Sequence, residues 1–564
     1  MAYRAPIDDI AAALYASAGL DRLAPLMGGL ERETVLAVLE GAGELASGVL
    51  APLNRFGDVQ GSRLENGRVV SPDGFPAAYR AFAEGGWNSL SADPAFGGQG
   101  LPKALELAVF EMVNAANMAF ALCPTLTQAA IEALQRHGAD RQKALYLPPL
   151  VSGEWTGTMH LTEPQAGTDL GAVRTLAEPA GDGTWRLNGQ KIFITWGDHD
   201  LTENIVHLIL ARTPGAPEGT RGLSLFLASK RLVEADGSLG AANDLKPASL
   251  EQKLGIHASP TCVMVYEGAR AELVGELNQG LAHMFTMMNA ARVAVGVQGV
   301  GIAEGAYQHA LAYARERRQG RAVWSEERPA AIFDHPDVRR MLVLMKAKIA
   351  AARAICLSAG VEADLARLAR DEGARRKAEL RAQLLTPIAK SWSTDVGVEV
   401  ASLGVQVHGG MGFIEETGAA QFYRDARIAP IYEGTNGVQA IDLVGRKLVM
   451  ESGEAVSDLI AEMRTTAAAL PDPSRLSAGI DALERASAWL AKAAGGADAL
   501  AGASAYLKLF GDVLGGAMLA KLAGAQPDTH GALSRVYAEQ VLIGAGALAD
   551  AATAGAAALA AVEL

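Results

Sequence analysis

The sequence predicts a mainly α-helical protein with a β domain inserted between helical blocks. Long stretches rich in Ala, Leu, Glu and Arg, residues that favour helices, occupy both ends of the chain. Between roughly residues 160 and 275 the pattern changes to short runs rich in Val, Ile, Leu, Phe and Thr, which favour strands. The chain has 564 residues, more than one hydrophobic core accommodates, so three or four structural units are expected.

The N-terminal block, from Ile7 to about Leu150, has a helical pattern. Two interruptions are expected within it, at Asn54–Gly61 and at the loop Ser91–Pro102, where breaker residues gather.

Four strand-like runs follow. The first, Trp185–Thr195, alternates apolar and polar residues around Asn188 and Gly189. Because both of these residues tolerate positive φ, the pair predicts a hairpin turn. The other three runs are Asn204–Arg212, Gly222–Lys230 and Thr261–Glu267.

After Gly280 the chain returns to helical patterns. The expected segments are Leu281–Arg318, His335–Gly360, the charged stretch Val361–Ala382, Leu385–Gly404 and a helix that starts near Asn436. Pro471–Ser474 marks a boundary, since proline removes a helix donor, and about three more Ala-rich helices are expected beyond it.

Composition narrows the function classes. Fifty basic and 63 acidic residues give a net charge of -13, which disfavours broad binding to nucleic acid or anionic lipid. The three cysteines are far apart, so neither a disulfide framework nor a metal site is expected, and their usage suits a reducing cytoplasm. No apolar stretch follows Arg4, so no signal peptide is expected. The Ala-rich tail Val541–Leu564 is broken by Asp550 and predicts a buried helix, not a membrane span.

Met159–Asp169 is a hydroxyl-rich segment that leads into the β domain. Thr162 and Thr168 can donate hydrogen bonds to a flavin or a phosphate, and Gly167 allows backbone amides to approach a ligand. An ordinary loop at the start of a β domain has the same composition, and the pattern alone favours that simpler interpretation.

Ile428–Gln439 places a carboxylate just before a helix. Thr435 or Asn436 can cap that helix, whose N-terminal end carries a positive partial charge. Glu433 lies on the tight Glu-Gly turn before the cap, where it could take a proton from a bound substrate. The alternative is a solvated loop acid, and the spacing alone does not separate the two.

Two further segments lie at helix ends. Gln406–Phe413 ends a helix with paired glycines; a C-terminal cap explains one, and close approach of a ligand explains the rest. Arg315–Arg321 contains four arginines within seven residues, which suits either a solvated face near the helix dipole or a phosphate clamp.

Taken in order, these four segments resemble the acyl-CoA dehydrogenase family over about residues 40–450. Thr162–Asp169 is similar to the first signature of that family, and Gln406–Phe413 with Tyr432–Gln439 is similar to the second. The resemblance implies an N-terminal helical domain, a β-barrel domain and a four-helix-bundle domain around FAD. It also identifies Glu433 as the catalytic base.

The resemblance implies a set of FAD contacts. Met159, Leu161 and Thr162 would contact the isoalloxazine ring, and Phe193 and Thr195 would flank its other edge, with Phe193 where many members have Trp. The remaining residues implied to contact FAD are Thr168, Arg317, Gln406, Gly410, Thr435 and Gln439.

The residues implied to contact the substrate are Thr168, Arg292, Glu433 and Gly434. Arg292 would lie near the CoA moiety, although Asn289 stands where the family often has Asp. A few members carry the base just before this arginine; here that position is Ala291, which cannot accept a proton, so Glu433 has no competitor.

The expected reaction is α,β-dehydrogenation of an acyl-CoA thioester to the 2-enoyl-CoA, with the α-proton passing to Glu433 and the β-hydride to flavin N5. Hydrogen bonds to the thioester carbonyl, from the Glu433 N–H and a flavin ribityl hydroxyl, would stabilise the enolate-like charge. Burial in a closed apolar pocket would raise the pKa of Glu433 toward the working pH.

The extra length resembles the larger members, which carry a C-terminal helical extension. The expected domains are helical 1–158, β 159–280, the helical bundle with the base 281–452, and an additional helical domain 453–564. Because such an extension covers the face through which smaller relatives form tetramers, a homodimer is expected. The expected location is the cytoplasm. The resemblance also implies an electron-transfer flavoprotein as electron acceptor.

Tyr3–Asp9 and Tyr432–Lys447 resemble a bacterial subgroup, the 3-methylmercaptopropionyl-CoA dehydrogenases and related broad-range members. The implied substrate is 3-(methylthio)propanoyl-CoA or a medium- or long-chain fatty acyl-CoA. An acyl-CoA oxidase, which passes electrons to oxygen, shares this fold and base. A DNA-binding or non-catalytic flavoprotein also shares the fold, but the net charge and the intact Glu433 argue against it.

Overall fold

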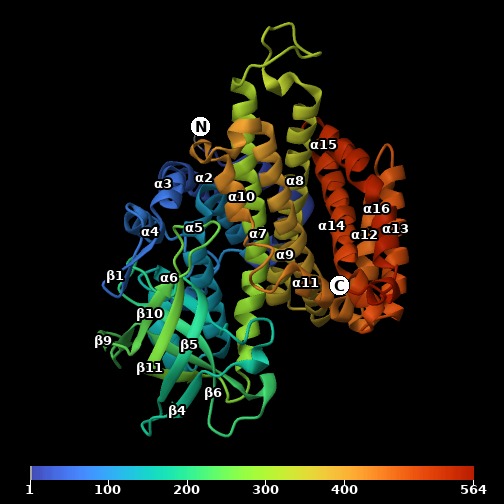
Figure 1. Cartoon of the computed structure of the whole chain (residues 1–564). Coiled ribbons are helices and arrows are strands. Elements are labelled where there is room, and N and C mark those ends of the chain that lie inside the picture. Colours follow the sequence, from blue (N-terminus) through green and yellow to red (C-terminus); the bar gives the residue numbers. More distant parts are fainter. Residues whose placement is uncertain (1–2) are drawn as a thin grey trace. The chain divides into compact units, whose positions relative to one another are not determined.

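The computed structural model describes residues 3–564, which form two compact units (Figure 1). Of the described residues, the helical unit comprises 3–44, Pro102–Ala116 and Arg292–Leu564. The barrel unit comprises Leu45–Leu101 and Asn117–Ala291. In helix α5 (Lys103–His137) the division falls at Asn117, whose backbone leaves the helical region (φ -160°, ψ 89°).

The sheet of the barrel unit closes on itself. Strands β11, β5, β4, β6 and β7 form a ring, because β7 pairs with both β6 and β11. Strand β10 extends the sheet along β11, and β3 pairs in parallel with β6. The bounds are β3 Thr156–His160, β4 Leu176–Pro179, β5 Trp185–Thr195, β6 Ile205–Arg212, β7 Leu223–Ser229, β10 Leu245–Leu250 and β11 Thr261–Val274. The predicted β-barrel within a mainly helical fold is confirmed.

Side chains of the barrel strands alternate between two cores, as the twofold period of a strand requires. On β6, Val206, Leu208 and Leu210 join the cluster formed with α5 and α6 (Asp140–Ser152). Ile209 and Ala211 point the other way, into the cluster shared by β4, β5, β7 and β11. Strands buried on both faces therefore read as nearly continuous apolar runs.

The predicted hairpin at Asn188 and Gly189 is wrong, because β5 runs unbroken from Trp185 to Thr195. Gly189 has a φ of +146°, and a Cβ there would lie 2.8 Å from the Thr175 Oγ1 and 3.0 Å from its Cα. The glycine thus serves a close approach between chain segments.

The expected interruption at Asn54–Gly61 is also wrong for most of its length, since α3 covers Ala51–Gln60. Gly57 is helical and packs tightly: a Cβ there would lie 2.8 Å from the Phe75 ring. The chain turns only at Gly61, with a φ of +66°. The remaining small elements of this unit are the π-helical turn Ala46–Leu50, β1 Arg63–Glu65, β2 Arg68–Val70, α4 Phe75–Glu84, β8 Arg231–Val233 and β9 Leu239–Ala242.

Long helices dominate the helical unit. In Figure 1, α7 (Gly280–Glu316), α8 (Pro336–Leu368) and α9 (Glu372–His408) run alongside one another. Glycines bring α7 very close to α9, because a Cβ on Gly296 would lie 2.5 Å from the Ala389 carbonyl oxygen. Shorter elements before the extension are α1 Ile7–Ala12, α2 Arg32–Leu45, α10 Ala419–Ala426 and α11 Asn436–Asp442.

A buried ion cluster ties three of these helices together. The Arg353 guanidinium on α8 donates to the Glu111 carboxylate on α5 at 2.8 and 3.0 Å and to Glu304 on α7 at 2.9 Å. All three side chains are buried. Burial raises the pKa of Glu111 against the lowering effect of Arg353, and the nearby Glu304 carboxylate raises it further.

The C-terminal extension packs against α9. Gly511 on α14 lies under the Trp392 ring, where a Cβ would meet the ring at 2.2 Å, and the Trp392 Nε1–H donates to Asp512 Oδ1 at 2.9 Å. The helices of the extension are α12 Glu454–Ala468, α13 Ser474–Lys492, α14 Ala497–Ala525, α15 Pro527–Gln540, α16 Ala545–Ala552 and α17 Ala557–Ala560. This region contains more helices than the sequence predicts.

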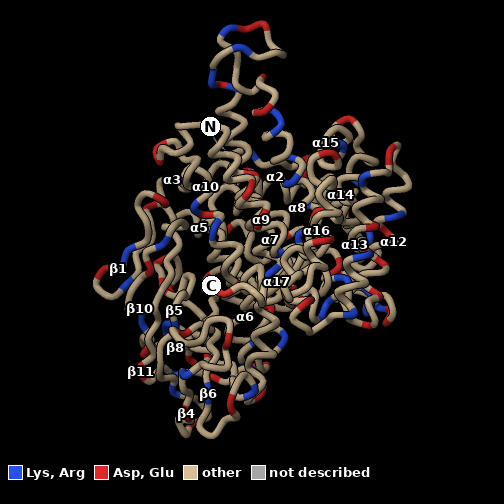
Figure 2. Tube along the Cα trace, turned by 45° about the vertical axis from the view of Figure 1, so that its right-hand side comes forward, with Lys and Arg blue, Asp and Glu red and all other residues tan. Residues whose placement is uncertain are grey.

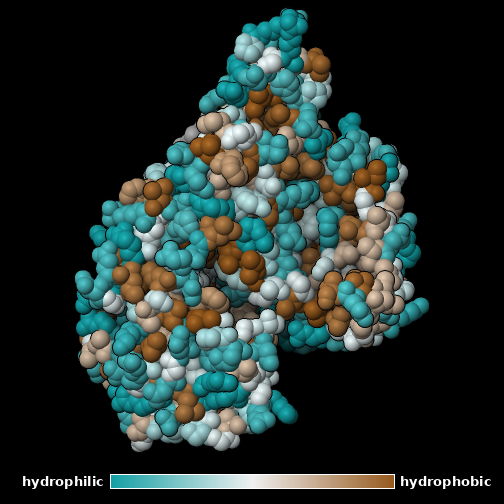
Figure 3. Space-filling model, in the orientation of Figure 1, coloured by the Kyte–Doolittle hydropathy of each residue, from teal (hydrophilic) through white to brown (hydrophobic). Residues whose placement is uncertain are grey.

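A hollow of about 570 Å³ lies in the extension, lined mainly by apolar and small residues of α12, α13 and the segment before α12. Apolar residues also gather on the surface of these C-terminal helices (Figure 3). The charged groups of the lining, Arg464 and Glu484, form an ion pair at 2.5 Å with each other. The hollow therefore offers no free acid or base for catalysis.

Two helical stretches are long and apolar enough to span a membrane by composition, Arg32–Gln60 and Lys103–His137. The apolar window of the second stretch is completely buried within the protein, and that of the first is 39% buried. The complete burial of the second stretch is typical of a core helix.

Candidate functional site

Glu433 lies on a loop before α11 whose backbone is left-handed. The φ angle is +56° at Glu433 and +83° at Gly434. For a residue with a side chain, such a conformation costs about 1–3 kcal/mol. The loop is tied at its end, because the Thr435 hydroxyl accepts an N–H of α11 at 3.2 Å and the Asn436 N–H donates to the Pro430 carbonyl at 2.9 Å. Of the two predicted caps, Thr435 is the one that the structure uses.

The environment of Glu433 favours a carboxyl group that titrates near neutrality. Burial raises its pKa to about 7, against the opposing charges of Arg292 and Lys390. Among residues 3–564, none forms a hydrogen bond or a direct ion pair with its carboxylate, and its backbone N–H is likewise without a hydrogen bond to the described chain. The side chain keeps partial solvent exposure. Glu433 thus presents a free carboxylate and a free N–H donor.

One residue that the sequence reasoning missed, Lys390, holds this loop. Lys390 on α9 is completely buried, and its Nζ donates to the Gly434 carbonyl at 2.9 Å and to Asn436 Oδ1 at 2.8 Å. The available signal was a lysine within the apolar run of α9, between Ala389 and Trp392.

The side-chain amide of Gln439 is buried without a hydrogen-bond partner in the described protein. Its side chain is 1% exposed, and neither Oε1 nor Nε2 has a hydrogen-bond partner in the described protein. A Cβ on Gly434 would lie 2.8 Å from this Nε2 and 3.8 Å from an Arg292 guanidinium nitrogen. Because an unsatisfied buried amide costs free energy, this geometry suits a polar ligand beside Gly434.

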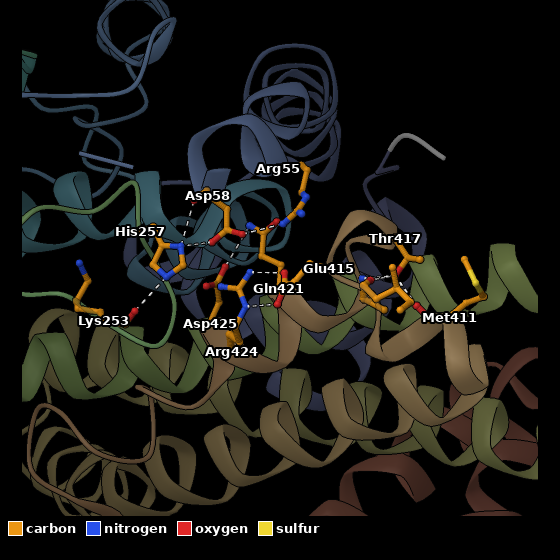
Figure 4. A network of polar contacts seen from close by, with 12 residues as sticks. Arg55, Asp58, Lys253, His257, Met411, Glu415, Thr417, Gln421, Arg424 and Asp425 are labelled. Carbon is orange, nitrogen blue, oxygen red and sulfur yellow. Dashed lines mark hydrogen bonds and ion pairs between the residues drawn. The ribbon is translucent and has the colours of Figure 1, made fainter. Parts of the chain in front are cut away.

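Gln406 and Gly410 lie at the exposed end of α9. Gly409 adopts a φ of +59° as the helix ends, and Cβ atoms on Gly409 and Gly410 would meet no protein atom within 4 Å. The Thr417 hydroxyl pins the following loop by donating to the carbonyls of Met411 (2.9 Å) and Ile414, as Figure 4 shows for Met411. The backbone here is ordered and open to a ligand.

Arg424 on α10 donates two hydrogen bonds, of 3.0 and 2.9 Å, to the Glu415 carboxylate in the preceding segment (Figure 4). Figure 4 also labels residues of the barrel unit, where Asp58 binds Arg55 at 2.9 Å and His257 Nδ1 at 2.8 Å. The other His257 nitrogen, Nε2, contacts the Lys253 carbonyl at 3.0 Å. Both ring nitrogens of His257 therefore have structural partners.

Arg317 is exposed just after the end of α7. The segment that joins α7 to α8 carries basic and acidic residues side by side (Figure 2), including the ion pair of Arg318 with Glu327. Among the described polar groups, the Arg317 guanidinium contacts only the Gln319 side-chain oxygen, at 3.5 Å. Its guanidinium is therefore available for a phosphate.

In the barrel unit, the Met159–Asp169 segment is organised by the buried Glu163. Its carboxylate accepts hydrogen bonds from Lys191 Nζ (2.8 Å), from the Thr175 hydroxyl (2.6 Å) and from the Arg174 N–H (2.7 Å). Burial alone would raise the pKa of Glu163, but Lys191 and these hydrogen bonds outweigh it and lower the pKa to about 2. Lys191 also donates to the Leu161 carbonyl at 2.9 Å, so the loop is fixed to β5.

Phe193 is aimed outward by a β-bulge. The β5–β11 register shifts between Lys191 and Ile194, and Phe193 adopts a φ of +61° with 57% of its side chain exposed. The Ile192 N–H donates to the Thr162 carbonyl at 2.9 Å, which keeps the two predicted flavin-contacting segments adjacent. Thr168 is exposed, Met159 is buried, and Leu161, Thr162 and Thr195 are partly buried.

Each unit therefore assembles part of the predicted site. Glu433, Gly434, Thr435, Gln439 and Arg292 come together in the helical unit. The predicted residues of the barrel unit are Met159, Leu161, Thr162, Thr168, Phe193 and Thr195. Within the helical unit, the Gln439 amide without a described partner and the glycines at the end of α9 leave polar groups and backbone open to a ligand. Within residues 3–564, no group of three metal-ligating side chains is found.

Four stretches match known family models. Residues 65–154, 158–269 and 278–449 match the N-terminal, middle and C-terminal domains of acyl-CoA dehydrogenases, and residues 459–563 match an acetyl-CoA dehydrogenase C-terminal-like domain. The chain is 54% identical over 456 residues to the 3-methylmercaptopropionyl-CoA dehydrogenase of Ruegeria pomeroyi, covering 80% of this chain and 77% of that protein.

Two solved structures share the fold over nearly the whole chain. Caenorhabditis elegans ACDH-11 in complex with C11-CoA has a TM-score of 0.79 at 23% identity, covering 96% of this chain and 92% of that one. An acyl-CoA dehydrogenase of Bacillus anthracis complexed with FAD has a TM-score of 0.75 at 21% identity, covering 95% and 89%.

The raised pKa of Glu433 has a measurable effect on stability. The folded state binds more protons than the unfolded chain between pH 4.5 and about 7, so the free energy of unfolding falls as pH rises through this window. Glu433→Gln is neutral at every pH and is expected to raise the free energy of unfolding at pH 8 by about 1–3 kcal/mol, with little change at about pH 4. Urea unfolding of both proteins at the two pH values measures this difference; a loss of stability at pH 8 would contradict it.

Proposed function

This chain belongs to the acyl-CoA dehydrogenase family, and on that premise we propose that Glu433 is the base that removes the α-proton of the substrate. The protein is an FAD-dependent oxidoreductase that dehydrogenates an acyl-CoA thioester. The observation that carries the proposal is the free Glu433 carboxylate with a pKa of about 7, held on a strained loop. A base of this pKa is half ionised near neutrality, where proton transfer is efficient.

The Glu433 backbone supports the same step. Its N–H, which is without a partner in residues 3–564, is proposed to donate to the thioester carbonyl and to stabilise the enolate-like charge. Gly434 adds no side chain beside this donor, and Arg292 supplies positive charge for the CoA moiety. On the barrel unit, Thr168 is proposed to contact the CoA chain from its exposed loop.

The cofactor contacts follow from the same residues. We propose that Met159, Leu161, Thr162, Phe193 and Thr195 contact the isoalloxazine ring of FAD. Those proposed to hold the rest of FAD are Thr168, Arg317, Gln406, Gly410, Thr435 and Gln439. The free Gln439 amide and the open backbone at Gly410 support this assignment. When bound, the flavin accepts the β-hydrogen of the substrate as a hydride.

We propose that the chain has four domains with different roles. The helical domain 1–158 supports the fold, the β domain 159–280 contacts the flavin ring, and the helical bundle 281–452 carries the base. The additional helical domain 453–564 packs against α9 and supports it. The proposed assembly is a homodimer, and its proposed electron acceptor is an electron-transfer flavoprotein. The three cysteines are free and buried, which supports the proposal of a reducing cytoplasmic setting. We also propose that the protein has no membrane span. Light scattering in solution tests the dimer and should give about twice the chain mass of 58.7 kDa; the mass of a tetramer would contradict it.

The substrate proposed is 3-(methylthio)propanoyl-CoA, because the relative with this name is 54% identical over most of both chains. A panel of acyl-CoAs from propanoyl to palmitoyl, with 3-methylthiopropanoyl, is expected to give the highest kcat/KM for the methylthio substrate, by about tenfold over butanoyl. Flavin reduction with an artificial electron acceptor provides the measurement. A higher value for a long-chain substrate would replace this assignment with a fatty acyl-CoA.

Glu433→Gln tests the base directly. The amide keeps the size of the side chain but cannot take a proton, so FAD retention is expected to be normal while flavin bleaching by acyl-CoA slows by at least about a thousandfold. Stopped-flow absorbance of the flavin measures the bleaching rate. Glu399→Gln on α9, which removes a partner of Lys348 instead, is the matched control and should bleach normally. Undiminished bleaching by Glu433→Gln would exclude this base.

A further inference from the structure

We infer that Lys390 is a positioning residue for Glu433, acting with Asn436 as a clamp on the loop that carries the base. The inference rests on the proposed role of Glu433. It concerns a residue that acts on the loop and not on the substrate.

Lys390 is unusual as a buried cation. Its side chain is inaccessible to solvent, and among residues 3–564 no carboxylate lies within ion-pair distance of its Nζ. Its hydrogen-bond partners are instead two neutral oxygens, the Gly434 carbonyl (2.9 Å) and Asn436 Oδ1 (2.8 Å). Burying an ammonium group is costly, and both of its bonds are made to the loop. The group therefore serves the loop and not the packing of α9.

Asn436 completes the clamp from the other side. Its Nδ2 donates to the Ser391 carbonyl at 3.1 Å, the Thr394 hydroxyl at 3.0 Å and Asp395 Oδ1 at 2.8 Å. These acceptors lie on α9 within five residues of Lys390. The loop is thus joined to one short stretch of a long helix.

The clamp keeps the strained backbone conformation of Glu433 in place. A left-handed residue with a side chain persists only where the surroundings fix it. Gly434 directly follows Glu433, so holding the Gly434 carbonyl fixes the peptide unit next to the strained residue. On the other side, Tyr432 is anchored by the hydrogen bond of its hydroxyl to Gln298 on α7.

The same cation acts on the charge of the base. The groups that face Glu433 are Arg292 from α7, Lys390 from α9 and the neutral Tyr432 phenol from its own loop. Lys390 in turn is faced by Glu433, Asp395 and Arg292, and Arg292 by Asp442 and Arg446. Both cations favour the ionised base, while burial opposes it. Without Lys390, only Arg292 remains to offset the burial, so the pKa of Glu433 rises.

Lys390→Met and Asn436→Ala separate the two effects in the FAD-loaded enzyme. Lys390→Met removes the charge and the hydrogen bonds, so kcat/KM at pH 7 is expected to fall at least about tenfold, and the acid-side inflection of its pH profile should move up by about one pH unit. Asn436→Ala keeps the ammonium, so kcat should fall at every pH with the inflection unchanged. In both variants, hydrogen–deuterium exchange of the peptide spanning residues 428–437 is expected to accelerate by about tenfold or more.

Lys348→Met provides the control, because Lys348 is also largely buried against α9, where it binds Glu399 at 2.5 and 2.6 Å. Its loop exchange and pH inflection should match those of the unaltered enzyme. If Lys390→Met does not fold, the exchange and pH data of Asn436→Ala still decide whether the clamp positions the loop.

Two outcomes are distinguishable. An unaltered enzyme that reduces its flavin normally, with clamp variants of unchanged loop exchange and unchanged pH profile, would overturn the role of Lys390 and leave the base assignment intact. An unaltered enzyme whose flavin no acyl-CoA reduces would instead overturn the proposed function itself.

Discussion

The structure depends on keeping one carboxylate, Glu433, partly shielded from water without pairing it directly with a cation. Burial raises its pKa to about 7, while Arg292 and Lys390 prevent a larger rise. A salt bridge in direct contact would hold the carboxylate ionised and occupy its lone pairs, and an apolar pocket alone would keep it protonated. Cations that lie near the carboxylate without bonding to it give a pKa between these two extremes. The left-handed backbone at Glu433 and Gly434 serves this balance, because it directs the side chain and the N–H away from internal partners.

Both units use the same device to hold an irregular segment. In the barrel unit, the buried Lys191 on β5 donates to the Leu161 carbonyl and to Glu163. In the helical unit, the buried Lys390 on α9 donates to the Gly434 carbonyl and to Asn436. Burial lowers the pKa of each lysine to about 8. Each ammonium fixes a loop from a regular element behind it, which leaves the outer side of the loop for ligand contacts.

The fold class was predictable because helix-favouring and strand-favouring residues separate cleanly along the chain. The glycine end of α9 was predictable because a helix end depends on neighbouring residues in the sequence. The cap of α11 was narrowed to Thr435 or Asn436 on the same basis, and the structure uses Thr435. Gly189 and Gly57 were misinterpreted as turn or breaker residues. Each is a glycine because another segment of the chain packs so closely that a side chain would not fit. The pairing of Lys390 with Asn436 was missed on the same grounds: the two residues are 46 positions apart, and only the packing of the loop on α9 makes them partners. Local pattern carries no signal for such pairs.

The contact of α14 with Trp392 gives the C-terminal extension a further meaning. Gly511 lies against the indole ring, and Asp512 accepts its N–H. Trp392 stands two positions after Lys390 on the same helix, so α14 of the extension covers an indole close in sequence to the lysine that holds the loop of the base. The last hundred residues are therefore not a removable appendage. A shortened version of the gene, ending where smaller relatives end, would have to be redesigned at position 392 before it could yield a well-behaved product.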